Sequence, residues 1–330
     1  MCTAISLQVK DHYFGRNLDL EGSFGEVVAI TPRNYPFSFR TKETIYHHYA
    51  MIGMAHMDQG YPLYYEATNE KGLSMAGLNF PGNADYKPMQ SEKDNIAPFE
   101  LIPWILGQCA NVKEAEILLS RLNIWKEKYS EQLPLSPLHW MISDADSSIV
   151  IESVKEGLKL YQNPLGVLTN NPTFDIQLFQ LNNYMHLSKG RPQNRFSDHL
   201  QLDTYSRGMG AIGMPGDWSS QSRFVKAAFV KMNSVCGSSE EEAVSQFFHI
   251  LSSVEHPMGC VAIRDGLFEI TIYSCCCNAN KGIYYYRTYG NSQITAVDMH
   301  RENIEGKKVV VYPMRTEECI FWQNELQLKE

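Results

Sequence analysis

The chain has 330 residues, of which 44% are hydrophobic and 20% charged, and its formal net charge is −8. This composition excludes a disordered or fibrous chain, and the length allows one large core or two smaller ones. The acidic balance, with no dense cluster of Lys and Arg, argues against a nucleic-acid partner, because neutralising phosphates needs clustered positive charge.

No run of 18 or more apolar residues occurs, and the N-terminus lacks a basic segment followed by an apolar one. A membrane-spanning helix needs the first pattern and a secretory signal the second. We therefore expect a cytoplasmic protein with no membrane partner, whose eight cysteines are reduced thiols. The cysteines at 275–277 lack the spacing of zinc ligands, and His256 has no partner at ligand spacing. We expect no metal and no cofactor.

The first nineteen residues, MCTAISLQVKDHYFGRNLD, contain the strongest functional signal. Methionine aminopeptidases remove Met1 when the next residue is small, so the mature chain is expected to begin with Cys2. An α-amine and a cysteine thiol both titrate near working pH. Placed on one residue, they make a nucleophile that carries its own general base. The alternative is an ordinary residue in a frayed terminus, but a strand-like pattern begins at once.

The opening stretch is typical of two strands joined by a turn at residues 10–11. In that register Cys2 lies opposite Asp19, within reach of a hydrogen bond between amine and carboxylate. Regular alternation sends Arg16 to the other face from Asp19. A bulge around Gly15 would turn Arg16 back.

The rest of the chain alternates between groups of strands and groups of helices. Closely spaced turns and alternating apolar residues predict strands at 26–30, 47–56, 62–68, 73–80, 138–142, 148–154, 158–161, 165–169, 266–274, 282–289 and 309–313. Apolar residues at helical spacing predict helices at 97–108, 112–122, 176–188, 223–232 and 240–253, the last capped by Ser239. A polar loop is expected at 190–197, and residues 170–172, Asn-Asn-Pro, form a tight loop at a strand end.

This order, sheet, helices, sheet, helices, sheet, predicts the fold class. Strands in hairpins pair antiparallel, and each sheet buries one face on the other sheet and one on helices. We therefore predict an α/β (α+β) fold, a four-layer αββα sandwich of two antiparallel sheets, in one domain over residues 1–330. A doubly wound parallel fold fits poorly, because strands and helices do not alternate one for one.

Five features together resemble one family: Cys2, FGRNLD (14–19), GLNFPG (77–82), LTNNP (168–172) and SSQSRF (219–224). The sequence is similar, over essentially its whole length, to the choloylglycine hydrolase family. That family includes bile salt hydrolases and penicillin V acylases, within the N-terminal nucleophile hydrolases. The resemblance implies the αββα fold, exposure of Cys2 as the first residue, and amide hydrolysis without a metal or cofactor.

The resemblance also implies roles for three residues of the first hairpin. Cys2 is the nucleophile and its own amine the proton shuttle. Arg16 corresponds to an arginine beside the sulfur, where a fixed cation favours the thiolate. Asp19 corresponds to the carboxylate that holds the α-amine.

Three further residues complete the implied site. Asn79 and Asn170 resemble the two donors to the oxyanion, and such donors contribute strongly to rate. Asn171 competes with Asn170, which is preferred because it follows the strand directly. Arg223 resembles an arginine that supports the site electrostatically. For any one position a surface charge, a turn residue or a strand cap is the simpler interpretation, but all six match together.

The resemblance finally implies a substrate. An asparagine at position 79 resembles the bile salt hydrolases, whereas penicillin acylases tend to have tyrosine there. We predict cleavage of glycine- and taurine-conjugated bile acids through a thioester, with Leu18, Phe24 and the loops near 57–63 and 130–138 forming an apolar wall. Relatives are commonly homotetramers. Penicillin V acylase or another N-acyl amide hydrolase remains an alternative, as does a non-catalytic amphiphile-binding protein.

Overall fold

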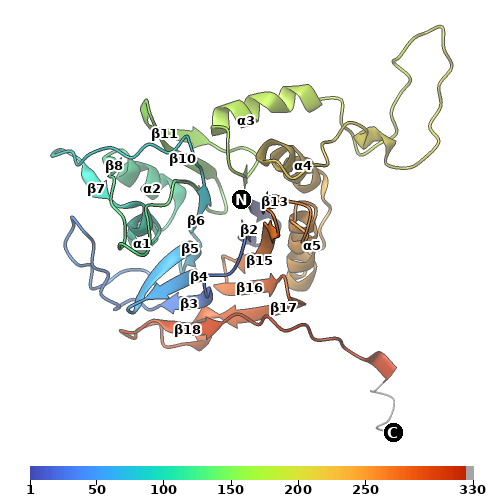
Figure 1. Cartoon of the computed structure of the whole chain (residues 1–330). Coiled ribbons are helices and arrows are strands. Elements are labelled where there is room, and N and C mark those ends of the chain that lie inside the picture. Colours follow the sequence, from blue (N-terminus) through green and yellow to red (C-terminus); the bar gives the residue numbers. More distant parts are fainter. Residues whose placement is uncertain (325–330) are drawn as a thin grey trace.

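Two antiparallel β-sheets lie face to face between layers of helices in the computed structural model, which describes residues 1–324 (Figure 1). The six-stranded sheet has the order β12 (Val167–Leu168), β1 (Cys2–Gln8), β2 (His12–Leu20), β15 (Ile270–Asn278), β16 (Ile283–Thr288) and β17 (Asn291–Asp298). The eight-stranded sheet has the order β11 (Gly157–Gln162), β10 (Ser148–Val154), β9 (Leu138–Ser143), β6 (Ser74–Asn79), β5 (Tyr61–Asn69), β4 (Met51–Asp58), β3 (Val27–Thr31) and β18 (Val310–Pro313).

Helices cover the outer face of each sheet. Helices α4 (Ser220–Asn233) and α5 (Glu240–Ser252) pack on the six-stranded sheet, and α1 (Leu101–Gln108) packs on β5 and β6 of the other. One hydrophobic cluster fills the space between the sheets and under α4 and α5, and a second joins the eight-stranded sheet to α1 and α2 (Val112–Leu119). The predicted four-layer αββα sandwich is therefore confirmed.

Smaller elements complete the fold. They are the parallel pair β7 (Asp94–Ile96) and β8 (Leu122–Ile124), the hairpin β13 (Ala262–Arg264) and β14 (Leu267–Phe268), and helix α3 (Phe174–Gln180), which is followed by a 3₁₀ turn, Leu181–Tyr184. Within the described residues, no helix combines the length and apolar character needed to cross a bilayer. Residues 185–217 form a long arm that projects from the body beyond α3 (Figure 1).

Several predicted boundaries were wrong. The helix expected to run to residue 122 ends at Leu119, and the next residues join strand β8. The helix expected over 176–188 stops at Gln180, where Asn182 donates to the Phe179 carbonyl oxygen. Strand β17 was not predicted, because its side chains are mostly polar and solvent-facing.

The pairing of the first hairpin differs from the prediction by one residue. Cys2 pairs with Leu18, not with Asp19, because the turn has three residues and Gln8 pairs with His12. The pairing is regular along the whole hairpin, so no bulge occurs at Gly15. The irregularity lies instead on β15, between Thr271 and Tyr273.

This register decides which side chains share a face. Residues paired across an antiparallel hairpin point the same way, and alternate residues point the same way along each strand. Arg16 therefore lies on the face of Cys2 without any bulge, towards the second sheet, and Asp19 lies on the opposite face. Gly15 is required for a separate reason: a Cβ atom there would lie 2.0 Å from the carbonyl oxygen of Cys275.

Candidate active site

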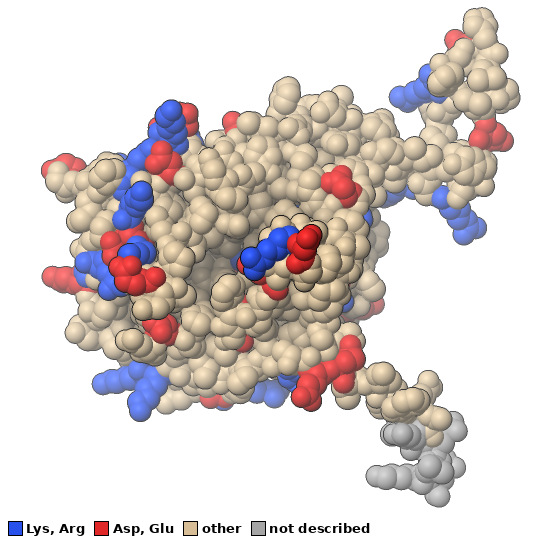
Figure 2. All heavy atoms as spheres, viewed as in Figure 1, with Lys and Arg blue, Asp and Glu red and all other residues tan. Residues whose placement is uncertain are grey.

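Cys2 is almost completely buried at the start of β1, the second strand of the six-stranded sheet. Its backbone N–H donates to Oδ1 of Asn170 at 2.9 Å, and its carbonyl oxygen accepts from Nη1 of Arg223 at 2.5 Å. The chain is thus fixed on both sides of the thiol-bearing carbon. In the view of Figure 2 the surface is hollowed near its middle, the region where Figure 1 places the N-terminus.

Arg16 is fully buried on the same face as Cys2. Its guanidinium donates to the carbonyl oxygen of Gly77 at 2.6 Å and to that of Tyr65 at 3.3 Å, and its Nε lies 3.8 Å from Oε2 of Glu66. Burial opposes the charge of Arg16, but Cys2 and neighbouring acidic groups outweigh it and raise the arginine pKa. The guanidinium is therefore a fixed cation beside the thiol.

Glu66 anchors that cation and was not singled out in the sequence. Its carboxylate accepts hydrogen bonds from the hydroxyl groups of Tyr273 at 2.7 Å and Tyr284 at 2.6 Å. Burial raises the pKa of Glu66, and Arg16 and the two tyrosines oppose that rise. No spacing in the sequence connects Glu66 with Arg16, because the two lie on different sheets.

Asp19 is fully buried on the other face of β2. Its Oδ1 accepts from Oγ1 of Thr271 at 2.6 Å, and its Oδ2 lies 3.9 Å from Nε2 of His256. Burial raises the pKa of Asp19, while Arg223 and the terminal ammonium counteract that rise. The carboxylate reaches the N-terminus from the helix side of the sheet, whereas the thiol points to the sheet interface.

Asn170 connects the two sheets at the site. Its Oδ1 accepts from Cys2 and also from Nη2 of Arg223 at 2.7 Å, and its Nδ2 donates to the carbonyl oxygen of Asn79 at 2.7 Å. Asn79 thus contacts Asn170 through its backbone carbonyl group. Asn171, the competing choice, donates instead to the carbonyl oxygen of Pro81.

Arg223 is the fourth residue of α4 and is also buried. It donates to Cys2, to Asn170 and to Oγ1 of Thr3 at 2.7 Å, and its Nε donates to the Trp218 carbonyl oxygen at 2.9 Å. Burial lowers the pKa of Arg223, and Asp19, Cys2 and Glu269 oppose that shift. The structure therefore gathers all six residues that the sequence motifs indicated.

The two residues expected to contact substrate differ in position. Leu18 is buried and lies directly opposite Cys2 in the hairpin, on the same face. Phe24 is 56% exposed in the loop after β2, where its carbonyl oxygen contacts Nδ1 of His56 at 2.9 Å. The other two loops of the expected wall meet each other, because Tyr129 donates to the carbonyl oxygen of Asp58 at 3.3 Å.

His256 has neighbours that the sequence did not reveal. It lies with Asp19 and Glu269 in a group whose ligand atoms are all within 4.8 Å of one another, the one set of this kind among the described residues that could hold a metal ion. The sequence has no partner for His256 at ligand spacing, but the fold brings two carboxylates close to it. Ligand spacing along the chain could not reveal this group, because its members are 13 to more than 200 residues apart.

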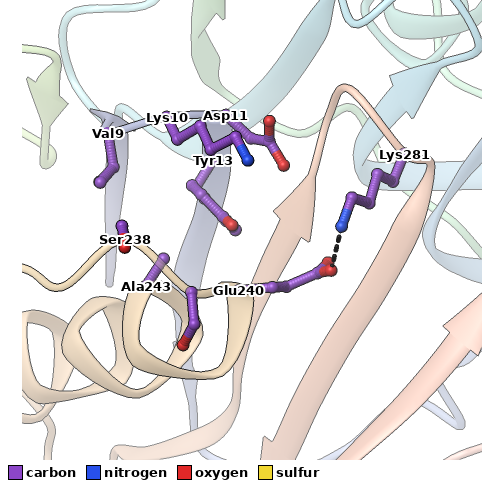
Figure 3. A pocket seen from close by; sticks show the side chains of 9 residues that line it. Val9, Lys10, Asp11, Tyr13, Ser238, Glu240, Ala243 and Lys281 are labelled. Atoms are coloured by element: carbon purple, nitrogen blue, oxygen red, sulfur yellow. Dashed lines mark hydrogen bonds and ion pairs between the residues drawn. The ribbon is translucent and has the colours of Figure 1, made fainter.

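Two cavities near these elements are separate from the thiol. The one in Figure 3, about 150 Å³, lies between the turn of the first hairpin and the start of α5, where Lys281 pairs with Glu240 at 2.6 Å. It contains none of the six site residues. A second cavity, about 370 Å³, is lined by His256 and Thr271 and so reaches the back of Asp19.

Comparisons with known proteins agree with this geometry. A family model described as linear amide C–N hydrolases, choloylglycine hydrolase family, matches residues 2–312. A protein of Lactiplantibacillus plantarum named bile salt hydrolase/transferase is 58% identical over 98% of this chain and 100% of its own.

Two solved structures are also similar. A mutant of conjugated bile acid hydrolase from Clostridium perfringens has a TM-score of 0.91 at 36% identity, covering 98% of this chain and 100% of that one. Penicillin V acylase from Agrobacterium tumefaciens has a TM-score of 0.71 at 19% identity, covering 94% of this chain and 90% of that one. At that identity the second match shows the fold alone.

Proposed function

This chain belongs to the choloylglycine hydrolase family of linear amide C–N hydrolases, and from that premise we propose that it hydrolyses bile salts conjugated with glycine or taurine. The observation that carries the proposal is the setting of Cys2. Its thiol lies beside the buried cation Arg16, and its backbone is held by Asn170 and Arg223. The relative that is 58% identical is named for action on bile salts.

The active form is the chain without Met1, as one domain that begins with Cys2. In the first step the Cys2 sulfur attacks the amide carbonyl carbon, and the carbonyl oxygen becomes an oxyanion. The α-ammonium gives a proton to the departing nitrogen, which leaves as glycine or taurine, and a thioester forms. Water then attacks the thioester, the α-amine accepts its proton, and the bile acid leaves while the sulfur returns to the thiolate.

Asn79 and Asn170 are the proposed donors to the oxyanion. Asn170 Nδ2 already points at this region, where it donates to the Asn79 carbonyl oxygen. A substrate oxygen would accept from that amide in the transition state, and stabilising charge that develops only there raises the rate. Asp19 holds the amine, and Arg16 and Arg223 favour the thiolate.

The steroid is proposed to lie against Leu18 and Phe24. The side chain of Leu18 lies on the same face of the sheet as that of Cys2. The exposed ring of Phe24, in the loop after β2, adds apolar surface. A rigid amphipathic ligand needs such an apolar wall with few polar contacts.

We further propose a cytoplasmic homotetramer. The arm at residues 185–217 carries large apolar side chains in solvent, among them Met185, Phe196 and Tyr205, each at least 80% exposed. Apolar side chains on a projecting arm are suited to burial against another copy of the chain.

One observation favours a second activity. The 58% identical relative is named a transferase as well as a hydrolase. In such a reaction an amine nitrogen attacks the thioester carbon in place of water, its proton passes to the Cys2 amine, and the sulfur leaves.

The test is release of free glycine and free taurine from glycocholate and taurocholate, with penicillin V as the comparison substrate. The proposal expects amino acid release by the native chain and none by Cys2→Ala of unchanged melting temperature. Hydrolysis of penicillin V alone would overturn the substrate assignment, and activity of Cys2→Ala would overturn the mechanism.

A further inference from the structure

Three buried side chains form an incomplete hydrogen-bond group beside the start of β1. Nε2 of His256 lies 3.9 Å from Oδ2 of Asp19, and Nδ1 lies 3.5 Å from Oε1 of Glu269. Neither ring nitrogen has a hydrogen-bond partner, nor does Oδ2 of Asp19, although His256 and Asp19 are completely buried. Buried polar atoms without partners are costly, so this group is suited to a further donor.

The structure places a cation at this group. The ammonium of Met1 pairs with the carboxylate of Glu269 and donates to the carbonyl oxygen of Asp19 at 2.5 Å. Met1 extends the hairpin, because its carbonyl oxygen accepts from the backbone N–H of Asp19 at 2.9 Å. The cation that the acidic group holds is thus a primary ammonium at the head of β1.

Removal of Met1, on which the proposed function rests, moves that charge by one residue. The nitrogen atoms of successive residues in an extended chain are about 3.6 Å apart, from standard bond lengths. The new ammonium on Cys2 therefore lies one residue from the place that Glu269 now contacts, and Glu269 loses its own partner. A glutamate side chain has the rotatable bonds to follow a shift of this size.

We propose that Glu269 is a second carboxylate for the α-ammonium of Cys2, acting with Asp19 and oriented by His256. Glu269 and His256 are positioning residues, since neither forms or breaks a bond in the reaction. Asp19 approaches from β2, and Glu269 approaches from the residue just before β15.

His256 is suited to orient the carboxylates because it is neutral. Burial, with a contribution from Arg223, lowers the pKa of His256 to about 3. A neutral imidazole has one N–H donor and one acceptor nitrogen, so it can donate to no more than one of the two carboxylates when they move closer. The other carboxylate is left to accept from the ammonium.

Thr271 fixes the geometry of this group. Its Oγ1 donates to Asp19 and accepts from the backbone N–H of His256 at 2.8 Å, and its own N–H donates to the His256 carbonyl oxygen at 3.1 Å. The position of His256 is therefore linked directly to that of Asp19.

The charges around the N-terminus then divide by function. Arg16 and Arg223 favour the thiolate, and they disfavour a positive charge on the neighbouring amine. Asp19 and Glu269 together stabilise a positive charge on the amine better than Asp19 alone. The two carboxylates therefore stabilise the ammonium, which carries the proton that passes to the leaving nitrogen.

A titration of the α-amine tests the proposal without any substrate. Cys2→Ser removes the thiol, keeps a small second residue for removal of Met1, and leaves one α-amine to follow. Competitive acetylation between pH 5 and 10, read on the N-terminal peptide by mass spectrometry, gives the pH at which half of that amine is deprotonated. Glu269→Gln in this background should lower the midpoint by about one pH unit, because a neighbouring negative charge is lost.

Two matched variants separate charge from structure. Glu269→Asp keeps the charge, so its midpoint should stay within about 0.3 pH units of the parent. Glu255→Gln removes a carboxylate next to His256 in sequence that pairs with Arg287 instead, so it should leave the midpoint unchanged. Melting temperatures are measured for all three.

Three results would overturn the proposal. The first is an unchanged midpoint in Glu269→Gln, and the second is an equal fall of the midpoint in Glu255→Gln. The third is retention of Met1 in Glu269→Gln, which would assign Glu269 to maturation. The titration uses no bile salt, so its result does not depend on whether the chain hydrolyses bile salts. A native chain that releases no glycine or taurine while the midpoint still moves would refute the substrate and leave Glu269 in its role.

Discussion

Arg223 and Asn170 form a 2.7 Å hydrogen bond at the same oxygen, Oδ1 of the asparagine, that accepts the backbone N–H of Cys2. One helix, one loop and the first strand therefore meet at a single atom. Arg223 adds a second bond, to the carbonyl oxygen of Cys2. The position of Cys2 is therefore fixed by these contacts as well as by the pairing of the first hairpin.

Replacing Arg223 by methionine should reduce both activity and stability. The change removes the largest of the positive charges that compensate Asp19 and the shared donor to four oxygen atoms. Removing one partner of a buried charge pair costs about 3–5 kcal/mol. We expect kcat/KM for glycocholate to fall about 100-fold or more, because misplacing the nucleophile has that effect. Lys226→Met on the same helix is the control, and equal losses in both variants would contradict the assignment.

The two adjacent asparagines should behave differently. Asn170→Ala removes the amide that faces Asn79 and the oxygen that holds Cys2. We expect kcat to fall about 10²–10³-fold, as in other sites that lose an oxyanion donor. Asn171→Ala removes only a contact with Pro81 and should change kcat less than about threefold. Steady-state kinetics with one conjugated bile salt measures kcat for both variants. A larger loss of kcat in Asn171→Ala than in Asn170→Ala would assign the donor role to Asn171.

A methyl group at position 15 should disrupt the six-stranded sheet. The Cβ of Gly15→Ala would lie 2.0 Å from the carbonyl oxygen of Cys275 in β15. A paired backbone carbonyl cannot move away from this contact as the end of a flexible side chain could. We expect a loss of roughly 3 kcal/mol or more in urea unfolding. Gly22→Ala, which meets nothing within 4 Å, should change stability by less than about 0.5 kcal/mol. Equal stability of the two variants would contradict the close approach of β2 and β15.

His12 should make the fold sensitive to mild acid. Burial lowers the pKa of His12 from 6.5 to about 4, with Asp144 opposing the shift. Between those two values the unfolded chain binds a proton that the folded chain does not, so stability falls as pH falls, by about 1.4 kcal/mol per unit. Below about pH 4 both states are protonated and the loss is complete.

Urea unfolding at pH 7.5 and pH 5 measures this effect. The drop in unfolding free energy should be smaller in His12→Gln than in the native chain by roughly 2 kcal/mol. The exposed His300→Gln is the control and should retain the full drop. An identical drop in His12→Gln would show that another group is responsible.

Local patterns in the sequence were sufficient to predict the layers of the fold, and the resemblance to one family indicated six residues that the structure brings together, whose roles stay predictions. Ser239 caps α5 as predicted, and its hydroxyl accepts from the backbone N–H of Glu242. The motifs around Arg16, Asn79, Asn170 and Arg223 are short and local, and they indicated a site only because all of them match one family together.

The pairing register of the first hairpin and the residues that contact the six site residues could not be predicted in the same way. The sequence fits both a two-residue turn at residues 10–11 and the three-residue turn at residues 9–11 that the structure has. The difference changes the partner of Cys2 from Asp19 to Leu18. Glu66, His256 and Glu269 contact the site from strands and loops far away in the chain. Since neither periodicity nor spacing links them to Arg16 or Asp19, tertiary structure was needed to find them.

The most direct measurement compares one protein with and without a residue before Cys2. A short extension joined to Cys2 through a specific protease site blocks the α-amine, and cleavage then exposes it, with both forms verified by intact mass. The account predicts no glycine release from glycocholate by the extended form and full release after cleavage. Turnover at the same rate before cleavage would contradict the role of the free amine.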